Sequence, residues 1–144
     1  MQEGHSNLLS VQRAIRILGI CLLVGIVIYL ATRKTEGISI AVEKDYLSLS
    51  HSSGESFDIS YQDILSVEET QDLNPGKNIS GIETKNYMFG IWENDVYGKY
   101  NLSIYSNVER YVVVKTSEKI VVFNLESLDA TDNFYKSFTE LIRT

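Results

Sequence analysis

Most of the chain alternates between apolar and polar residues with a period of two. The alternating segments are 38–42, 46–50, 57–61 and 100–104. Residues 111–115 and 120–123 are instead apolar on both faces, and the polar residues 116–119 between them are typical of a tight turn. Half-buried antiparallel strands have the first pattern, and central strands have the second. Because no helical segment separates the strands, the sequence predicts successive hairpins rather than a parallel βαβ sheet.

The period changes near the C-terminus. Phe134, Phe138, Leu141 and Ile142 are spaced i, i+4, i+7 and i+8, which is one stripe of an amphipathic helix. Asp129 is the expected N-cap, and Asp132 completes a capping-box-like pair. The sequence therefore predicts a C-terminal helix whose apolar face packs on the sheet.

A third pattern lies near the N-terminus, where residues 17–32 carry no charge. This run would form roughly 24 Å of helix, slightly less than the about 30 Å of a bilayer core. Basic residues at both ends can reach back to the headgroups. We expect residues 14–32 to form a single transmembrane helix. Its lipid-facing side chains would be Ile17, Leu18, Ile20, Leu22, Leu23, Val24, Ile26, Val27, Ile28 and Leu30.

Two other interpretations of this run are weaker. A cleaved secretory signal would place Tyr29 three residues before a cut at Ala31, where a small residue is needed. A lipoprotein signal at Cys21 would have the large Ile20 just before the cysteine. The basic residues at the two ends are balanced, so the positive-inside rule does not decide on which side of the membrane the domain lies.

The expected organisation is a short tail (1–13), the transmembrane helix (14–32), a linker (33–36) and a folded domain (37–144). The chain is 44% hydrophobic and 22% charged, which is typical of a folded protein. Residues 35–144 contain nine lysine and arginine residues against 18 aspartate and glutamate residues, a net charge of −9. This balance argues against nucleic acid and against docking on anionic headgroups, since both need clustered basic residues.

The strand order with a closing helix resembles the pleckstrin-homology (PH) fold. Residues 59–64 followed by Val67 are similar to the strand, Asp-Ile, strand element of bacterial PH-like domains. Gly81, Gly90 and Gly98, residues 102–105, and residues 120–124 before the helix are also similar to that family. The resemblance covers most of residues 37–143 and implies an α+β fold. That fold is a strongly bent antiparallel sheet, or partly open barrel, of about seven strands with one C-terminal helix. It also implies a bacterial membrane setting and no particular activity.

Lipid binding is not expected to carry over from eukaryotic PH domains. Their phosphoinositide-binding members place lysine and arginine beside the first strand-to-strand loop. The matching place here is Glu43-Lys44-Asp45, which has one lysine between two acids.

Sites for metals and catalysis are weakly indicated. Residues 72–83 partly match an EF-hand loop, but Lys77 stands where that loop requires glycine, so a plain turn at Asn74-Pro75-Gly76 is favoured. Cys21 lies in the apolar run. His51 has serines beside it that are more simply turn formers, and it is expected on the surface. We therefore expect no catalytic residue, no metal and no cofactor, and a protein that is not an enzyme.

Aromatic residues are concentrated between residues 87 and 105. One interpretation is that they fill a small β core. The other is that Trp92 and Tyr97 flank a loop that presents aromatic anchors to a partner. An unpaired sheet edge is a second candidate surface, because an edge can accept a peptide strand.

The expected function is a non-enzymatic binding or scaffolding module, held in a cell membrane by one helix, with a protein partner. The alternative is an envelope sensor that binds a small ligand or ion through residues 71–99.

Overall fold

The computed structural model describes residues 10–18 and 37–143. The chain divides into two units, Met1–Thr35 and Glu36–Thr144. In the first unit, residues 10–18 form an exposed helix that includes Ile17 and Leu18. No helix within the described residues is long and apolar enough to cross a membrane. Most of the predicted span at 14–32 lies outside the described residues. The same holds for eight of its anchor positions, which are Ile20, Leu22, Leu23, Val24, Ile26, Val27, Ile28 and Leu30.

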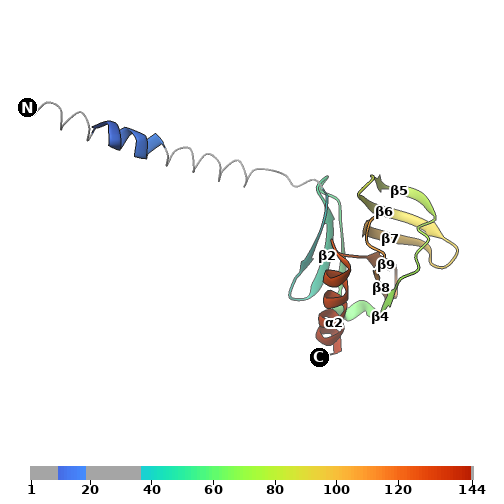
Figure 1. Ribbon diagram of the computed structural model, residues 1–144. Coiled ribbons are helices and arrows are strands. Elements are labelled where there is room, and N and C mark those ends of the chain that lie inside the picture. Colours follow the sequence, from blue (N-terminus) through green and yellow to red (C-terminus); the bar gives the residue numbers. More distant parts are fainter. Residues whose placement is uncertain (1–9, 19–36, 144) are drawn as a thin grey trace, which may run out of the picture. The chain divides into compact units, whose positions relative to one another are not determined.

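The second unit has nine strands and a C-terminal helix, where the sequence predicted about seven strands (Figure 1). Its elements are β1 (Ile38–Val42), β2 (Tyr46–His51), β3 (Ser56–Ser60), the 3₁₀ turn η1 (Tyr61–Asp63), β4 (Ile64–Thr70), β5 (Lys77–Glu83), β6 (Tyr87–Asn94), β7 (Gly98–Tyr105), β8 (Tyr111–Thr116), β9 (Ile120–Phe123) and α2 (Leu128–Arg143). The predicted α+β class is confirmed.

The strands form two sheets. The first has the order β1-β2-β3 and consists of two successive antiparallel hairpins, as the alternation predicts. The second has the order β4-β8-β9-β7-β6-β5. Strands β8 and β9 lie inside this sheet and form the hairpin expected from their two apolar faces.

One pairing departs from the predicted hairpin order. Strand β9 lies between β7 and β8 and pairs with β7 in parallel, with Leu102 opposite Val122. The predicted hairpins are present, and among the described strands the β7–β9 pair is the one parallel pairing. After β7 the chain enters β8, which lies two positions away in the sheet. The next strand, β9, then takes the position between β7 and β8.

The six-stranded sheet is bent, and the chain length explains why. Strands β4 and β5 lie at opposite edges but are joined by residues 71–76 alone. Six strands in a flat sheet would span about 24 Å between the edges. A fully stretched link of that length would barely reach. The link is not stretched straight, because it contains two turns in which the Asp72 N–H donates to the Thr70 hydroxyl and the Gly76 N–H donates to the Asn74 side chain. The bend predicted from the PH resemblance is thus a consequence of this short connection.

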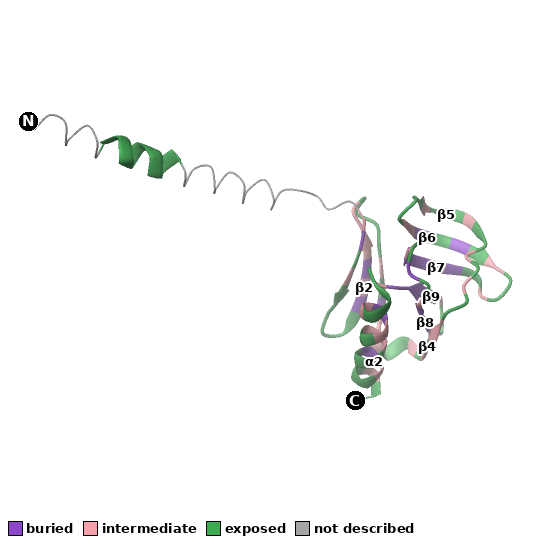
Figure 2. Ribbon diagram, in the orientation of Figure 1, coloured by how far each residue is buried: buried purple, intermediate pink, exposed green. Residues whose placement is uncertain are grey.

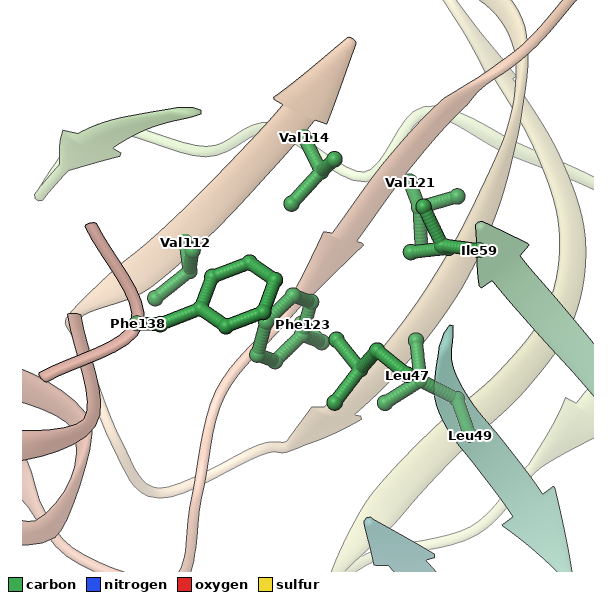
Figure 3. Packing of buried hydrophobic residues seen from close by; sticks show 8 residues of the cluster. All are labelled: Leu47, Leu49, Ile59, Val112, Val114, Val121, Phe123 and Phe138. Carbon is green, nitrogen blue, oxygen red and sulfur yellow. The ribbon is translucent and has the colours of Figure 1, made fainter. Parts of the chain in front are cut away.

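Successive side chains of β8 and β9 point to opposite faces of the sheet and therefore belong to two separate hydrophobic clusters. Val112, Val114, Val121 and Phe123 face the three-stranded sheet and α2, where they meet Leu47, Leu49, Ile59 and Phe138 (Figure 3). Val113 and Val122 point to the opposite face and pack with Trp92, Tyr100 and Leu102. Figure 2 shows the buried residues gathered along these inner strands.

Helix α2 closes the first cluster. Phe138 is buried, and Phe134 stacks on it at 5.3 Å between ring centroids. Leu141 of the predicted stripe is 47% exposed, whereas Ile142, the next residue, packs against the first cluster. The helix begins at Leu128, and the Ser127 hydroxyl accepts the N–H of Ala130. The prediction of Asp129 as N-cap is therefore wrong, since Ser127 already caps the helix.

Candidate functional site

The turn between β6 and β7 is fixed by one side chain. The carboxamide oxygen of Asn94 accepts hydrogen bonds from the N–H groups of Val96 (3.1 Å) and Tyr97 (2.7 Å). The amide nitrogen of Asn94 donates to the carbonyl of Asn74 at 2.8 Å, which fastens this turn to the β4–β5 link. Gly98 ends the turn with φ 67°, a conformation that favours glycine. We call residues 94–98 the hairpin tip.

The link facing the hairpin tip is equally well fixed. Asn74 accepts the N–H of Gly76 in an Asx turn, and the Tyr100 hydroxyl donates to the carbonyl of Pro75 at 2.8 Å. A β-carbon at Gly76 would collide with Glu93, so the close approach requires glycine there. The predicted turn at Asn74-Pro75-Gly76 is confirmed. Residues 77–83 form β5, so the segment compared with an EF-hand loop is mostly strand.

A hollow of about 290 Å³ lies between the link and the hairpin tip. Three carboxylates, Asp72, Glu93 and Asp95, belong to its lining, together with Leu73 and Val96. No lysine or arginine lines it. Within 10–18 and 37–143 no group of three or more histidine, cysteine or acidic side chains is placed to hold a metal ion.

The two predicted interface residues have different positions. Trp92 is 1% exposed and packs in the second cluster, so the structure supports the core interpretation for it. Tyr97 is half-buried, and its ring meets Tyr100 edge-on at 5.4 Å. Burial raises the pKa of the Tyr97 phenol, with smaller opposing effects from Lys115 and Glu68. Sequence reasoning missed Val96, which is 79% exposed at the hairpin tip. An isolated apolar residue in a polar turn was the available signal.

Strand β1 forms one edge of the three-stranded sheet. Glu43 donates to Tyr46 and Ser52 donates to Gly37, so the odd-numbered residues of β1 make the ladder to β2. The backbone groups of Ile38, Ile40 and Val42 consequently face the outer edge. The carbonyl of Ile38 accepts the Tyr105 hydroxyl at 3.1 Å.

One hollow borders this edge, and a second hollow shares Glu126 with it. The first, of about 260 Å³, lies between β1 and the β9–α2 connection and is lined by Ile38, Ile40, Leu125 and others. The second, of about 450 Å³, lies between the β7–β8 loop and the start of α2. Glu126 lines both, and Glu109 is the second charged residue along them.

Asn124 fixes the backbone segments that line these hollows. It is fully buried, and its carboxamide exchanges hydrogen bonds with the backbone of Tyr105 and donates to Val108 at 2.9 Å. The Asn124 side chain therefore joins the end of β9 to the β7–β8 loop.

His51 is only half-buried, but it is not the simple surface residue that the sequence predicted. Its Nδ1 accepts the N–H of Ser53, so the neutral ring carries its proton on Nε2, which lies 3.1 Å from the Tyr87 hydroxyl. The ring also lies 5.5 Å from Phe89, centroid to centroid. His51 thus joins the two sheets. The Ser53 hydroxyl lies 2.8 Å from Nδ1, the other nitrogen of the ring.

A charged group lies where β4 meets α2. Arg110 pairs with Asp132 at 3.4 Å and with Glu69 at 3.8 Å. Burial, followed by a hydrogen bond and the charge of Asp132, raises the pKa of Glu69, while Arg110 and Lys136 lower it. Arg110 thus connects the helix to the sheet.

Comparison with known proteins agrees with this architecture. Residues 38–138 match the bacterial PH domain family, so the chain belongs to that family. No curated protein and no solved structure matches the chain significantly.

Proposed function

We propose that this bacterial PH domain protein is a non-enzymatic binding and scaffolding module, tethered to a membrane by residues 14–32, that binds a protein partner through its hairpin tip. The exposure of Val96 on a turn already fixed by Asn94 carries the proposal. A preordered loop loses little conformational entropy on binding, so its contacts contribute fully to affinity.

The surroundings of Val96 support a protein partner. Tyr97 lies beside it with a half-buried ring, and carboxylates of the neighbouring hollow surround the pair. An apolar and aromatic centre with a polar rim is the usual composition of a protein interface.

Site-specific photo-crosslinking tests the partner. A photoreactive phenylalanine analogue is placed at position 96 of the full chain in cells, and a second chain carries it at the exposed position 118 in the β8–β9 turn. A discrete crosslinked product from position 96 alone is the expected result. Equal products from both positions, or none from position 96, would refute binding at the hairpin tip.

The membrane tether is supported by the uncharged run at 17–32 and the basic residues around it. Alkaline carbonate extraction of cell membranes tests it. The chain should stay in the membrane pellet, and a Val24→Arg, Val27→Arg double variant should be released, because charges at the helix centre oppose insertion. Release of the unaltered chain would contradict the tether.

The side of the membrane is open to a direct measurement. In a Cys21→Ser background, Ser117→Cys places one thiol in the exposed β8–β9 turn. Labelling of intact cells by an impermeant maleimide would place the domain outside, and labelling only after lysis would place it in the cytoplasm.

The hollow of about 290 Å³ favours one alternative function, a sensor for a small cationic ligand, because three carboxylates line it. A ligand that binds only the folded state raises the melting temperature. A rise produced by a panel of small amines, and abolished by Asp95→Asn, would favour the sensor over the protein-binding module.

A further inference from the structure

Four strands form the edges of the two sheets, and three of these edges are blocked. Strand β4 carries a register shift between Ile64 and Ser66 and has two adjacent acidic residues, Glu68 and Glu69, near its end. Strand β5 carries a shift between Asn78 and Ser80 and begins and ends with charged residues. On β3, the Lys119 ammonium group donates to the outward carbonyl of Asp58 at 2.8 Å. Bulges, charges and lysine are the devices by which proteins prevent unwanted strand pairing.

Strand β1 has no bulge, charge or proline, and only its first residue is engaged at the outer edge, where the Ile38 carbonyl accepts the Tyr105 hydroxyl. Its sequence, Ile-Ser-Ile-Ala-Val, contains no charge and no proline, and its register with β2 is regular from Ile38 to Val42. In the part of the chain that the structure describes, no strand pairs with its outer edge. The backbone N–H and C=O groups of Ile40 and Val42 face that edge.

The hollow beside β1, together with the hollow that shares Glu126 with it, gives the edge a chemical preference. Ile38, Ile40 and Leu125 form an apolar wall in the first hollow. The charged residues lining the two hollows are Glu109 and Glu126, and no lysine or arginine lines either one. A strand that follows β1 would bury apolar side chains and place basic side chains near these carboxylates.

We infer that the outer edge of β1 accepts an extended, basic peptide strand from a protein partner, which adds a fourth strand to the three-stranded sheet. The inference rests on the proposed protein-binding function but uses a surface separate from the hairpin tip. Main-chain hydrogen bonds give such complexes affinity, and the side-chain pockets give them specificity. A second copy of this chain is the poorer occupant, because residues 35–144 carry a net charge of −9 and two copies repel.

Peptide titration of the full chain in an uncharged detergent tests the inference. The probe is a fluorescent heptapeptide of alternating valine and lysine, Val-Lys-Val-Lys-Val-Lys-Val. The controls are the same peptide with glutamate for lysine, and the lysine peptide N-methylated at every peptide bond so that neither edge can donate hydrogen bonds. We expect binding of the lysine peptide alone, and weaker binding at higher salt.

Two kinds of variant locate the site. Val42→Pro removes an N–H that faces outward and leaves the β2 ladder intact, and it should weaken binding about fivefold. Glu109→Gln with Glu126→Gln keeps the shape and removes the charge, and it should weaken binding about threefold and reduce the salt dependence. Glu118→Gln, in the β8–β9 turn away from the hollows, is the matched control.

Each outcome decides the inference. Equal binding of the glutamate peptide, equal binding of the N-methylated peptide, or no effect of the glutamine pair would overturn it. A dimer that Val42→Pro dissociates, without peptide binding, would assign the edge to a second copy and also overturn it. If Val42→Pro fails to fold, the N-methylated peptide makes the same test on the unaltered chain. Val96→Ser should leave peptide binding unchanged, so failure of the hairpin-tip proposal is seen separately in the position-96 crosslink.

Discussion

The indole ring of Trp92 on β6 lies over Gly81 on β5 and occupies the space that a β-carbon would need. Gly81 pairs with Gly90 across the two strands, so the large ring on one strand is matched by small residues on both. This arrangement explains why two of the glycines that resemble the bacterial PH pattern lie in strands, where glycine is otherwise unfavourable.

Gly81→Ala should destabilise the protein by about 1–3 kcal/mol, because the added methyl group forces the indole or the backbone to move. The penalty should be smaller in a Trp92→Phe background, where the ring is shorter. Some penalty should remain, since the carbonyl of Phe89 would also lie 2.6 Å from the new carbon. Denaturant unfolding of the four proteins in this double-mutant cycle gives the coupling. Strict additivity would show that the ring does not require the glycine.

Asn124→Asp should cost more than about 2 kcal/mol at neutral pH, because a carboxylate would replace the amide that donates to two carbonyls in a buried site. Thermal unfolding at pH 7 measures the loss. Asn107→Asp, in the exposed part of the same loop, is the control and should stay near the unaltered protein. Similar melting temperatures for the two variants would contradict the bracing role of Asn124.

Burial, with a smaller effect of Tyr97, raises the pKa of Tyr100 to about 12. The folded state therefore holds this proton more tightly than the unfolded state, whose tyrosine has a pKa near 10. The stabilisation is complete below about pH 10 and is lost as the pH rises through about 12. Tyr100→Phe should flatten the fall in unfolding free energy across this range. It should also lower the stability at pH 7 by about 1–2 kcal/mol, because the Pro75 carbonyl loses its donor. An unchanged alkaline slope would show that another group causes it.

Folding raises the pKa of Glu69, so the folded state binds this proton more tightly than the unfolded state. The resulting stabilisation is complete below the unfolded pKa of 4.5 and is lost as the pH rises through the pKa of the folded state. Glu69→Gln keeps the size of the side chain and removes its charge. We expect this variant to melt at a higher temperature than the unaltered protein at pH 7, with a smaller difference at pH 4. Glu118→Gln, which is exposed, should show no such pH dependence. A lower melting temperature for Glu69→Gln at pH 7 would mean that the Arg110 ion pair outweighs burial.

The sequence predicted those strands whose alternation faces a core, such as 38–42 and 100–104, because burial on one face imposes the period. It did not predict β5 as a strand, since Lys77–Glu83 is a largely exposed edge strand and burial leaves little mark on it. The parallel pairing of β9 with β7 depends on long-range packing that no local pattern encodes.

The candidate site was predicted only in part. Trp92 and Tyr97 belong to one aromatic region of the sequence, but Trp92 lies on the buried face of a strand and Tyr97 lies at the hairpin tip. The alternation of apolar and polar residues shows which face of a strand is buried, but it gives no information on which residues of a turn are exposed. Sequence reasoning proposed an unpaired edge without identifying it, because the contact of Lys119 with β3 comes from the β8–β9 turn, which is distant in the chain.

The position of β9 has a consequence for the folding of the chain during its synthesis on the ribosome. Four residues near the end of the domain, 120–123, separate β7 from β8 and pair with both. Until they emerge, β7 and β8 each present an unsatisfied row of backbone groups, and Leu102 and Val113 lack the valine between them. Nascent chains stalled before residue 120 should therefore be sensitive to protease and recruit chaperones, and chains long enough to expose residues 120–143 outside the ribosome should become resistant in one step.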